Sequence, residues 1–127
     1  MSDTTTKGVR VEVSSEYIPA QSDPPKQQFF FAYHVKISNT GVDPVKLLTR
    51  HWVITDAFGK VEQVRGPGVV GEQPRLEPGE AFEYSSACPL TTPHGSMHGS
   101  YQMITDDGVA FNAQIDPFTL SQTGSQN

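Results

Sequence analysis

The sequence predicts an all-β sandwich of about seven short strands, and three observations support this prediction. Segments in which apolar and polar residues alternate recur along the chain, and each ends at Gly, Pro, Asn or Asp. The 11 glycines and 10 prolines interrupt helices. Only 35% of the 127 residues are apolar, so they must lie in short stretches with one face inward. This composition disfavours a helical bundle.

The first three predicted strands show the strongest alternation. Residues 9–13 alternate valine with charged residues, which is typical of a strand with one wet face. Residues 29–38 have an aromatic or β-branched side chain at every odd position, so the odd positions are expected to share one buried face. In residues 45–55, one face is expected to hold Leu48, Trp52 and Ile54, with Trp52 as the largest candidate core residue.

The later strands are shorter, and each is bounded by a turn signal such as Gly59, Gly79 or Gly108. The first of them, at residues 60–65, would pair as a hairpin with the strand at residues 45–55. Short strands separated by frequent turns predict an immunoglobulin-like or fibronectin type III-like sandwich. In chain order, these later strands are expected at residues 60–65, 81–86, 101–105 and 109–115.

A single domain, residues 8–120, is predicted between two flexible tails. The length of 127 residues suits one domain. Residues 1–7 and 121–127 are small and polar, and they cannot bury enough apolar surface to offset the entropy of ordering.

Charge and cysteine content limit the partners and the compartment. The 14 acidic and 9 basic residues give a net charge of −5 without a Lys/Arg cluster, which argues against nucleic-acid binding. No apolar run approaches about 18 residues, so membrane insertion is not expected. The single cysteine cannot form an internal disulfide, which fits a cytoplasmic protein. A monomer is expected, or a weak homodimer if edge strands pair between chains.

The segment from Gly66 to Gly71 matches the G-x-G-x-x-G pattern of dinucleotide sites. That pattern needs a following helix whose amides face the pyrophosphate, and Pro74 and Pro78 exclude such a helix here. Two interpretations remain open: the glycines allow a tight turn or bulge, or the loop amides form a nest that binds an anion. The candidate anion-binding residues are Arg65, Gly66, Gly68, Val69, Gly71 and Arg75.

His94 and His98 form a candidate site for weak divalent metal binding. They are four residues apart, which separates them by roughly 13 Å in an extended chain unless the chain bends at Gly95. The surrounding Pro93 and Gly99 predict a turn that enters a strand. Surface or hydrogen-bonded histidines are the alternative interpretation.

The sequence shows no catalytic constellation, and neither enzymatic activity nor a cofactor is expected. Cys88 precedes Pro89, and no neighbour would lower its pKa, so a buried structural thiol is predicted. Phe30 has the opposite parity to Phe29 and Phe31, which makes it a candidate contact for a protein partner. The alternative is that this strand is buried on both sides at its start.

Several spaced motifs occur in one order along the chain, at residues 31–33, 47–52, 66–74, 78–79, 92–103 and 108–111. Through these motifs, the chain resembles the ApaG family, also called CorD, from residue 9 to about residue 120. The resemblance implies a fibronectin type III-like sandwich in a bacterial protein linked to cobalt tolerance and magnesium efflux. Related modules in eukaryotic F-box and polymerase-interacting proteins imply protein binding, and the family's glycine-rich loop implies a pyrophosphate site.

The leading functional hypothesis is therefore a non-enzymatic interaction module that acts in Co²⁺ and Mg²⁺ homeostasis through an unidentified protein partner. One alternative is a small-anion binder for pyrophosphate or a dinucleoside polyphosphate at residues 66–71. A second alternative is weak direct binding of a divalent metal at His94 and His98.

Overall fold

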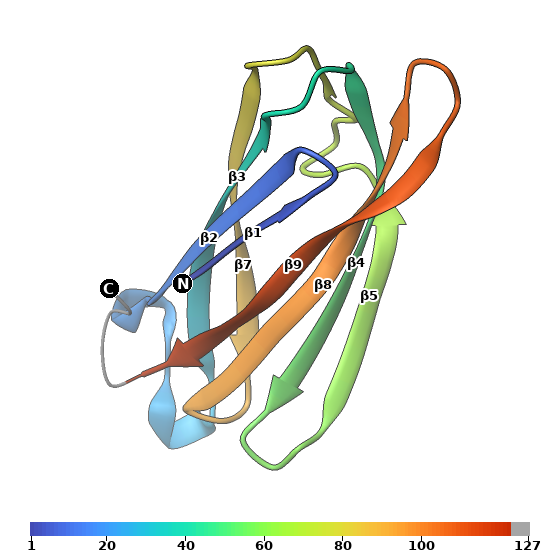
Figure 1. Ribbon diagram of the computed structural model, residues 1–127. Coiled ribbons are helices and arrows are strands. Elements are labelled where there is room, and N and C mark those ends of the chain that lie inside the picture. The colour runs from blue at the N-terminus through green and yellow to red at the C-terminus, as the bar shows by residue number, and fades with distance from the viewer. Residues whose placement is uncertain (123–127) are drawn as a thin grey trace.

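Antiparallel β-strands make up most of the described chain. The computed structural model describes residues 1–122, which fold into two sheets packed face to face (Figure 1). The all-β sandwich expected from the sequence is confirmed. The strands are β1 (Ser2–Thr6), β2 (Val9–Tyr17), β3 (Phe29–Asn39), β4 (Val45–Asp56), β5 (Val61–Pro67), β6 (Arg75–Leu76), β7 (Ala81–Leu90), β8 (His94–Thr105) and β9 (Ala110–Ser121).

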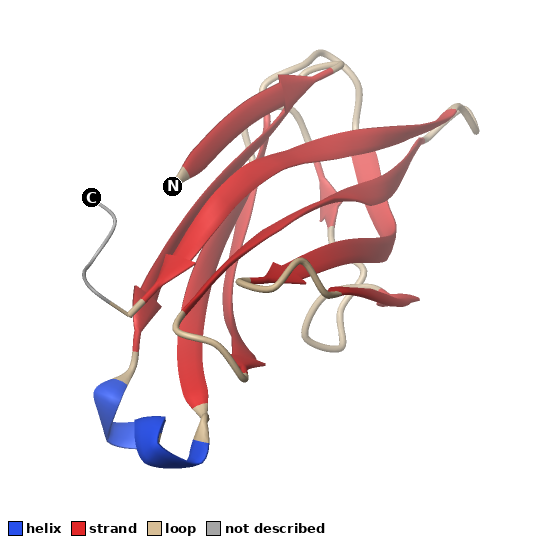
Figure 2. Cartoon of the chain, turned by 90° about the horizontal axis from the view of Figure 1, so that it is seen from below, coloured by secondary structure: helices blue, strands red, loops and turns tan. Residues whose placement is uncertain are grey.

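The helical content of residues 1–122 is two short 3-10 turns between β2 and β3. Figure 2 shows these turns, η1 (Pro19–Gln21) and η2 (Pro24–Lys26), at one end of the sandwich. Each turn has three residues, and no helix in the described part of the chain is long and apolar enough to cross a membrane.

The two sheets meet along one side of the sandwich and stay apart along the other. The first sheet has the order β1-β2-β3-β7, and the second has the order β5-β4-β8-β9, with β6 also pairing with β4. On the closed side, β1 and β2 contact β9, and Ser15 Oγ donates a hydrogen bond to the Thr119 carbonyl at 2.8 Å. On the other side, β5 and β7 are the edge strands of their sheets, and within the described residues they do not pair with each other. The sandwich is therefore open between β5 and β7.

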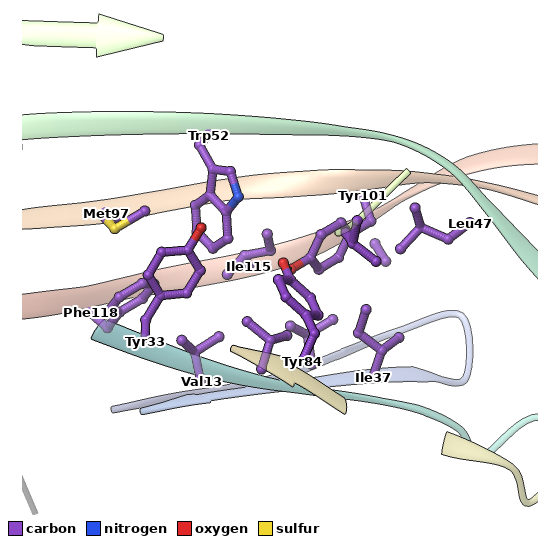
Figure 3. Close-up of a cluster of buried hydrophobic side chains, with 14 of the residues drawn as sticks. Val13, Tyr33, Ile37, Leu47, Trp52, Tyr84, Met97, Tyr101, Ile115 and Phe118 are labelled. Carbon is purple, nitrogen blue, oxygen red and sulfur yellow. The ribbon is translucent and has the colours of Figure 1, made fainter. Parts of the chain in front are cut away.

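The core forms where the inward residues of β3 meet those of β4, β8 and β9 (Figure 3). The odd positions of β3 are buried from Phe29 to Ile37, as the alternation predicts. Trp52 lies at the centre, with its ring centroid 5.3 Å from that of Tyr33, 5.9 Å from that of Phe118 and 6.3 Å from that of Tyr101. Edge-to-face packing of this kind is favourable beyond the area it buries.

Strand β4 changes the parity of its buried residues partway along its length. The register between β4 and β8 shifts between Leu47 and Thr49, which marks a β-bulge. Leu47 is buried on one side of the bulge and Trp52 on the other, whereas Leu48 is only half-buried. The prediction that Leu48 shares the face of Trp52 is wrong, because the extra residue shifts the alternation by one.

Residues 2–6, predicted as part of a flexible tail, form strand β1. The strand pairs with β2 over its full length, and Arg10 donates two hydrogen bonds to the carboxylate of Asp3. A backbone ladder does not need apolar side chains, and threonine favours extended structure, so a polar segment can add to an existing sheet. At the other end, Ser121 completes β9. The rest of the predicted C-terminal tail, residues 123–127, lies outside the described residues.

The segment around His94 and His98 is the first half of strand β8 and not a turn. Its glycines are needed for close approach of β8 to β4. A Cβ at Gly99 would lie 2.0 Å from the His51 carbonyl oxygen, and one at Gly95 would lie 2.7 Å from the Thr55 carbonyl oxygen. The glycines that suggested a turn therefore lie in paired strand.

Candidate functional site

A polar groove of about 570 Å³ lies on the five-stranded sheet, on the face turned away from the core. Thr49 and His51 of β4 alternate with the inward-facing Trp52, whereas Arg50 lines both this groove and the space between the two sheets. Because the sheet order places β5, β4, β8 and β9 side by side, four strands contribute to the lining. The lining residues are Thr49, Arg50, His51, Arg65, Gly66, Pro67, Ser100, Gln102 and Asn112.

Hydrogen bonds hold the floor of the groove in one arrangement. Thr49 Oγ1 donates to Gln102 Oε1 at 2.7 Å, and Gln102 Nε2 donates to Ser100 Oγ at 2.8 Å. His51 Nε2 donates to Gln63 Oε1 at 2.8 Å beside them. Arg65 is exposed at the edge and makes no ion pair with any residue from 1 to 122. The groove thus offers a ligand the positive charge of Arg65 and several polar side chains.

The glycine-rich loop is held mainly by its own backbone and by Arg50. The Gly68 amide donates to the Leu48 carbonyl at 2.9 Å, and the Val69 amide donates to the Glu72 carbonyl at 2.8 Å. Arg50 Nη1 donates to the carbonyls of Pro67 and Gly68, each at 3.0 Å. Two amides on which an anion nest would depend are therefore already engaged. Positive φ angles at Gly68 and Gly71 give the segment the geometry of a tight turn.

The structure brings only part of the predicted anion site together. Arg65 and Gly66 line the groove, whereas Val69 is fully buried in the core. Arg75 lies on β6, where its guanidinium pairs with the carboxylates of Asp106 and Glu77. The hydrogen bond from Arg75 holds the pKa of Asp106 below its usual range. The charge of Arg75 is thus directed to these acids and does not reach the groove.

His94 and His98 lie on β8 with exposed side chains. His94 is paired in register with Ser121, and His98 with Val53. No group of three or more His, Cys, Asp or Glu side chains positioned for a metal ion occurs among residues 1–122. The structure therefore adds no third ligand to this histidine pair.

Phe30 faces away from the core but is half-buried. It lies opposite Pro89 of the edge strand β7. Its backbone is tied to the preceding loop, because its carbonyl accepts from the Ile18 amide at 2.9 Å and its amide donates to Ser22 Oγ at 2.9 Å. Phe30 alternates in burial with its buried neighbours Phe29 and Phe31, and the loop holds its backbone in place.

Cys88 is a buried thiol, as its sequence context predicts. Its exposed fraction is 4%. Burial raises the pKa of the Cys88 thiol to about 11, and the negative charge of Glu62 adds to the effect. At neutral pH the sulfur is therefore protonated and a poor nucleophile.

The raised pKa predicts slow alkylation of Cys88. At pH 8 the native protein should react with iodoacetamide about a hundredfold more slowly than the urea-unfolded protein, because less thiolate is present. The thiolate fraction increases with pH, so the native rate should still be rising at pH 9, where the unfolded rate approaches its plateau. Mass spectrometry of quenched samples measures both rates. A native plateau near pH 9 would contradict the assignment.

Two features of this region have little signal in the sequence. Arg50 lies on the inward face of β4, opposite Tyr101 of β8, although arginine is seldom placed toward a core. The Trp52 indole N–H is buried and has no hydrogen-bond partner in the described part of the chain. Alternation with Trp52 places Arg50 on the inward face, but arginine is usually exposed, and alternation does not show which atoms a buried N–H will meet.

Comparison with known proteins identifies the family. The model of the ApaG domain family matches residues 19–105 of this chain. The chain belongs to the ApaG family. A Protein ApaG of Rhodospirillum centenum is 56% identical over 115 residues, which cover 91% of this chain and 88% of that protein. A Protein ApaG of Anaeromyxobacter dehalogenans is 53% identical over 127 residues and is covered completely, as is this chain.

Solved structures show the ApaG fold with the same architecture. A crystal structure from Bordetella pertussis, of a protein given the name ApaA, matches with a TM-score of 0.89 and 50% identity, and the match covers 91% of this chain and 94% of that one. The C-terminal domain of wzt matches with a TM-score of 0.56 and 11% identity, covering 98% of this chain and 79% of that one. That second likeness concerns the fold alone. The matched ApaG segment contains every groove residue except Asn112.

Proposed function

We propose that this ApaG protein is a non-catalytic protein-interaction module that acts in Co²⁺ and Mg²⁺ homeostasis. The observation that supports it best is the open edge of the five-stranded sheet at β5. Every residue of β5 except Gly66 is exposed, including Val61 and Val64, which expose 53% and 41% of their surface. An uncovered edge strand is a template for pairing with a strand of another chain.

The hydrogen-bond pattern specifies which groups β5 offers. The Gly68 amide donates to Leu48, and the Lys60 carbonyl accepts from Asp56, so the even-numbered residues are the ones bonded to β4. In an antiparallel ladder, bonded and non-bonded pairs alternate. The odd-numbered residues therefore direct their backbone groups away from the sheet. Pro67, which has no N–H, falls at an odd position, where it costs no bond to β4.

The polar groove lies next to this edge, and the two surfaces share Arg65. A partner strand alongside β5 would form main-chain hydrogen bonds with Val61, Gln63 and Arg65. Its side chains would then meet the groove, where hydroxyl and amide groups are held in place. Main-chain pairing supplies affinity in this binding mode, and side-chain contacts supply specificity.

Gln63→Pro tests the edge directly. The substitution removes one outward N–H and leaves the bonds to β4 in place. A photo-crosslinking residue at position 61 is expected to capture a partner in cells, and Gln63→Pro should abolish the product. Gln63→Thr is the matched control, since it also loses the contact with His51 but keeps the amide. Equal crosslinking from a probe at Lys36, on the outer face of the other sheet, would contradict an interaction at β5.

The homeostasis role is tested separately by growth on medium containing Co²⁺. In a strain that lacks its own ApaG, the wild-type chain and Gln63→Thr should restore tolerance, whereas Gln63→Pro should not. Full rescue by Gln63→Pro would show that cation tolerance does not depend on the β5 edge.

A second candidate function is binding of pyrophosphate or a dinucleoside polyphosphate. The observation that favours it is Arg65, which has no ion-pair partner among the described residues and lies at the edge of a groove lined by Ser100 and Asn112. Titration of ¹⁵N-labelled protein with pyrophosphate should then shift the Arg65 and Gly66 resonances saturably, and Arg65→Gln should remove the response. Arg75→Gln, which alters an arginine already paired with acids, is the control. No saturable shift would exclude this function.

A further inference from the structure

A second cavity, of about 380 Å³, opens between the two sheets on the side of the edge strands β5 and β7. One wall is formed by side chains of β4 and β5, and the other by β3 and β7. This inter-sheet cleft differs from the polar groove, which lies on the outside of the second sheet, although Arg50 lines both. Its lining residues are Tyr33, Arg50, Trp52, Ile54, Glu62, Val64, Ser86, Ala87, Cys88, Pro89 and Met97.

The cleft contains a buried hydrogen-bond donor without an acceptor. Trp52 is 2% exposed, and its Nε1 makes no hydrogen bond with any of residues 1–122. Leaving such a donor unpaired costs about 1–3 kcal/mol unless water or a ligand supplies the acceptor. Figure 3 shows the indole nitrogen on the side of the ring that faces Tyr101, and Tyr101 is the cross-strand partner of Arg50. The free N–H thus points toward the buried Tyr101, and Arg50 lies beside it, two residues before Trp52 on the same face of β4.

The same cleft contains a cation without a carboxylate partner. Arg50 is half-buried on the inward face of β4 and makes no ion pair within residues 1–122. Its only hydrogen bonds there use Nη1, which binds the carbonyls of Pro67 and Gly68. Burial raises the pKa of Tyr33, and the nearby charge of Arg50 partly offsets this rise. The charge of Arg50 therefore acts toward the inside of the sandwich.

We propose that the inter-sheet cleft binds a small monocarboxylate with a flat apolar body, and that Trp52 Nε1 and the Arg50 guanidinium hold its two oxygens. A carboxylate has two acceptor oxygens, one for each donor, and charge-assisted bonds of this kind are among the strongest. The apolar body lies against Ile54, Val64 and Met97. Glu62 at the cleft disfavours a multiply charged anion such as a phosphate ester.

The single tryptophan of the chain provides a direct readout. In ¹H–¹⁵N spectra of the full-length protein, the one indole N–H resonance should shift saturably on titration with benzoate. Benzamide has the same shape without the charge, and it should bind at least about tenfold more weakly. A free carboxylate and the C-terminus of a partner chain share this chemistry. A peptide ending in phenylalanine that binds more tightly than benzoate would identify the partner chain as the source.

Three variants test the residues. Arg50→Gln should weaken benzoate binding about tenfold or more, whereas Arg65→Gln, the same change in the outer groove, should leave it unchanged. Because Arg50 also holds the glycine-rich loop, Val64→Phe serves as an independent test: it narrows the cleft without touching Arg50 and should also abolish binding. An indole resonance that does not shift saturably overturns the proposal. Equal responses to benzoate and benzamide, or equal weakening by Arg50→Gln and Arg65→Gln, also overturn it.

Discussion

Trp52→Ala is expected to lower the free energy of unfolding by about 3–5 kcal/mol. The side chain is 2% exposed and makes ring contacts with Tyr33, Tyr101 and Phe118, which come from both sheets. Truncation removes these contacts and leaves a cavity that rigid strands cannot fill. Since small domains are stable by only about 5–15 kcal/mol, the variant should lose much of its stability. Urea unfolding followed by far-UV circular dichroism measures the change.

Trp52→Phe is the matched control for this prediction. It keeps an aromatic ring among the same neighbours and removes the unpaired indole N–H, so it should destabilise the protein by less than Trp52→Ala. A loss of under about 1 kcal/mol for Trp52→Ala would show that the surrounding side chains collapse into the space.

Gly99→Ala is expected to destabilise the protein by about 3 kcal/mol or more. The added Cβ would lie 2.0 Å from the His51 oxygen, 3.0 Å from the His51 carbonyl carbon and 3.2 Å from the Trp52 Cα. These atoms are all backbone, so no side chain can rotate away, and β8 would have to separate from β4. The contact lies in the interior of the five-stranded sheet, where such a shift also disturbs the register with β9.

Gly41→Ala is the control for the loss of a glycine as such. A Cβ at Gly41 would meet its nearest neighbour at 3.5 Å, an ordinary contact. Its stability should therefore stay within about 1 kcal/mol of the wild type. Thermal and urea unfolding of both variants give the comparison. Equal stabilities for Gly99→Ala and Gly41→Ala would mean that β4 and β8 can move apart at little cost.

The candidate site was only partly visible in the sequence. The G-x-G-x-x-G pattern drew attention to residues 66–71, and Arg65 and Gly66 do line the groove. The amides of Gly68 and Val69 are instead bonded to Leu48 and Glu72. A pattern of glycines specifies permitted backbone angles but not the carbonyls that the loop will meet, because those carbonyls belong to other parts of the chain.

The sequence by itself determined the sandwich class and the buried face of β3. Alternation has a period of two, which is a local property, so the odd positions of residues 29–37 could be assigned without knowledge of any partner strand. The thiol of Cys88 was likewise predicted correctly from its neighbours.

The tertiary structure alone decided which edges stay open and what faces the gap between them. Pairing of the polar β1 with β2 closes one side against β9, and the bulge before Thr49 turns Arg50 and Trp52 inward on β4. These outcomes depend on register between strands distant in the chain. One inserted residue reverses every side chain beyond it, and local periodicity therefore cannot show which side chains before and after the bulge share a face.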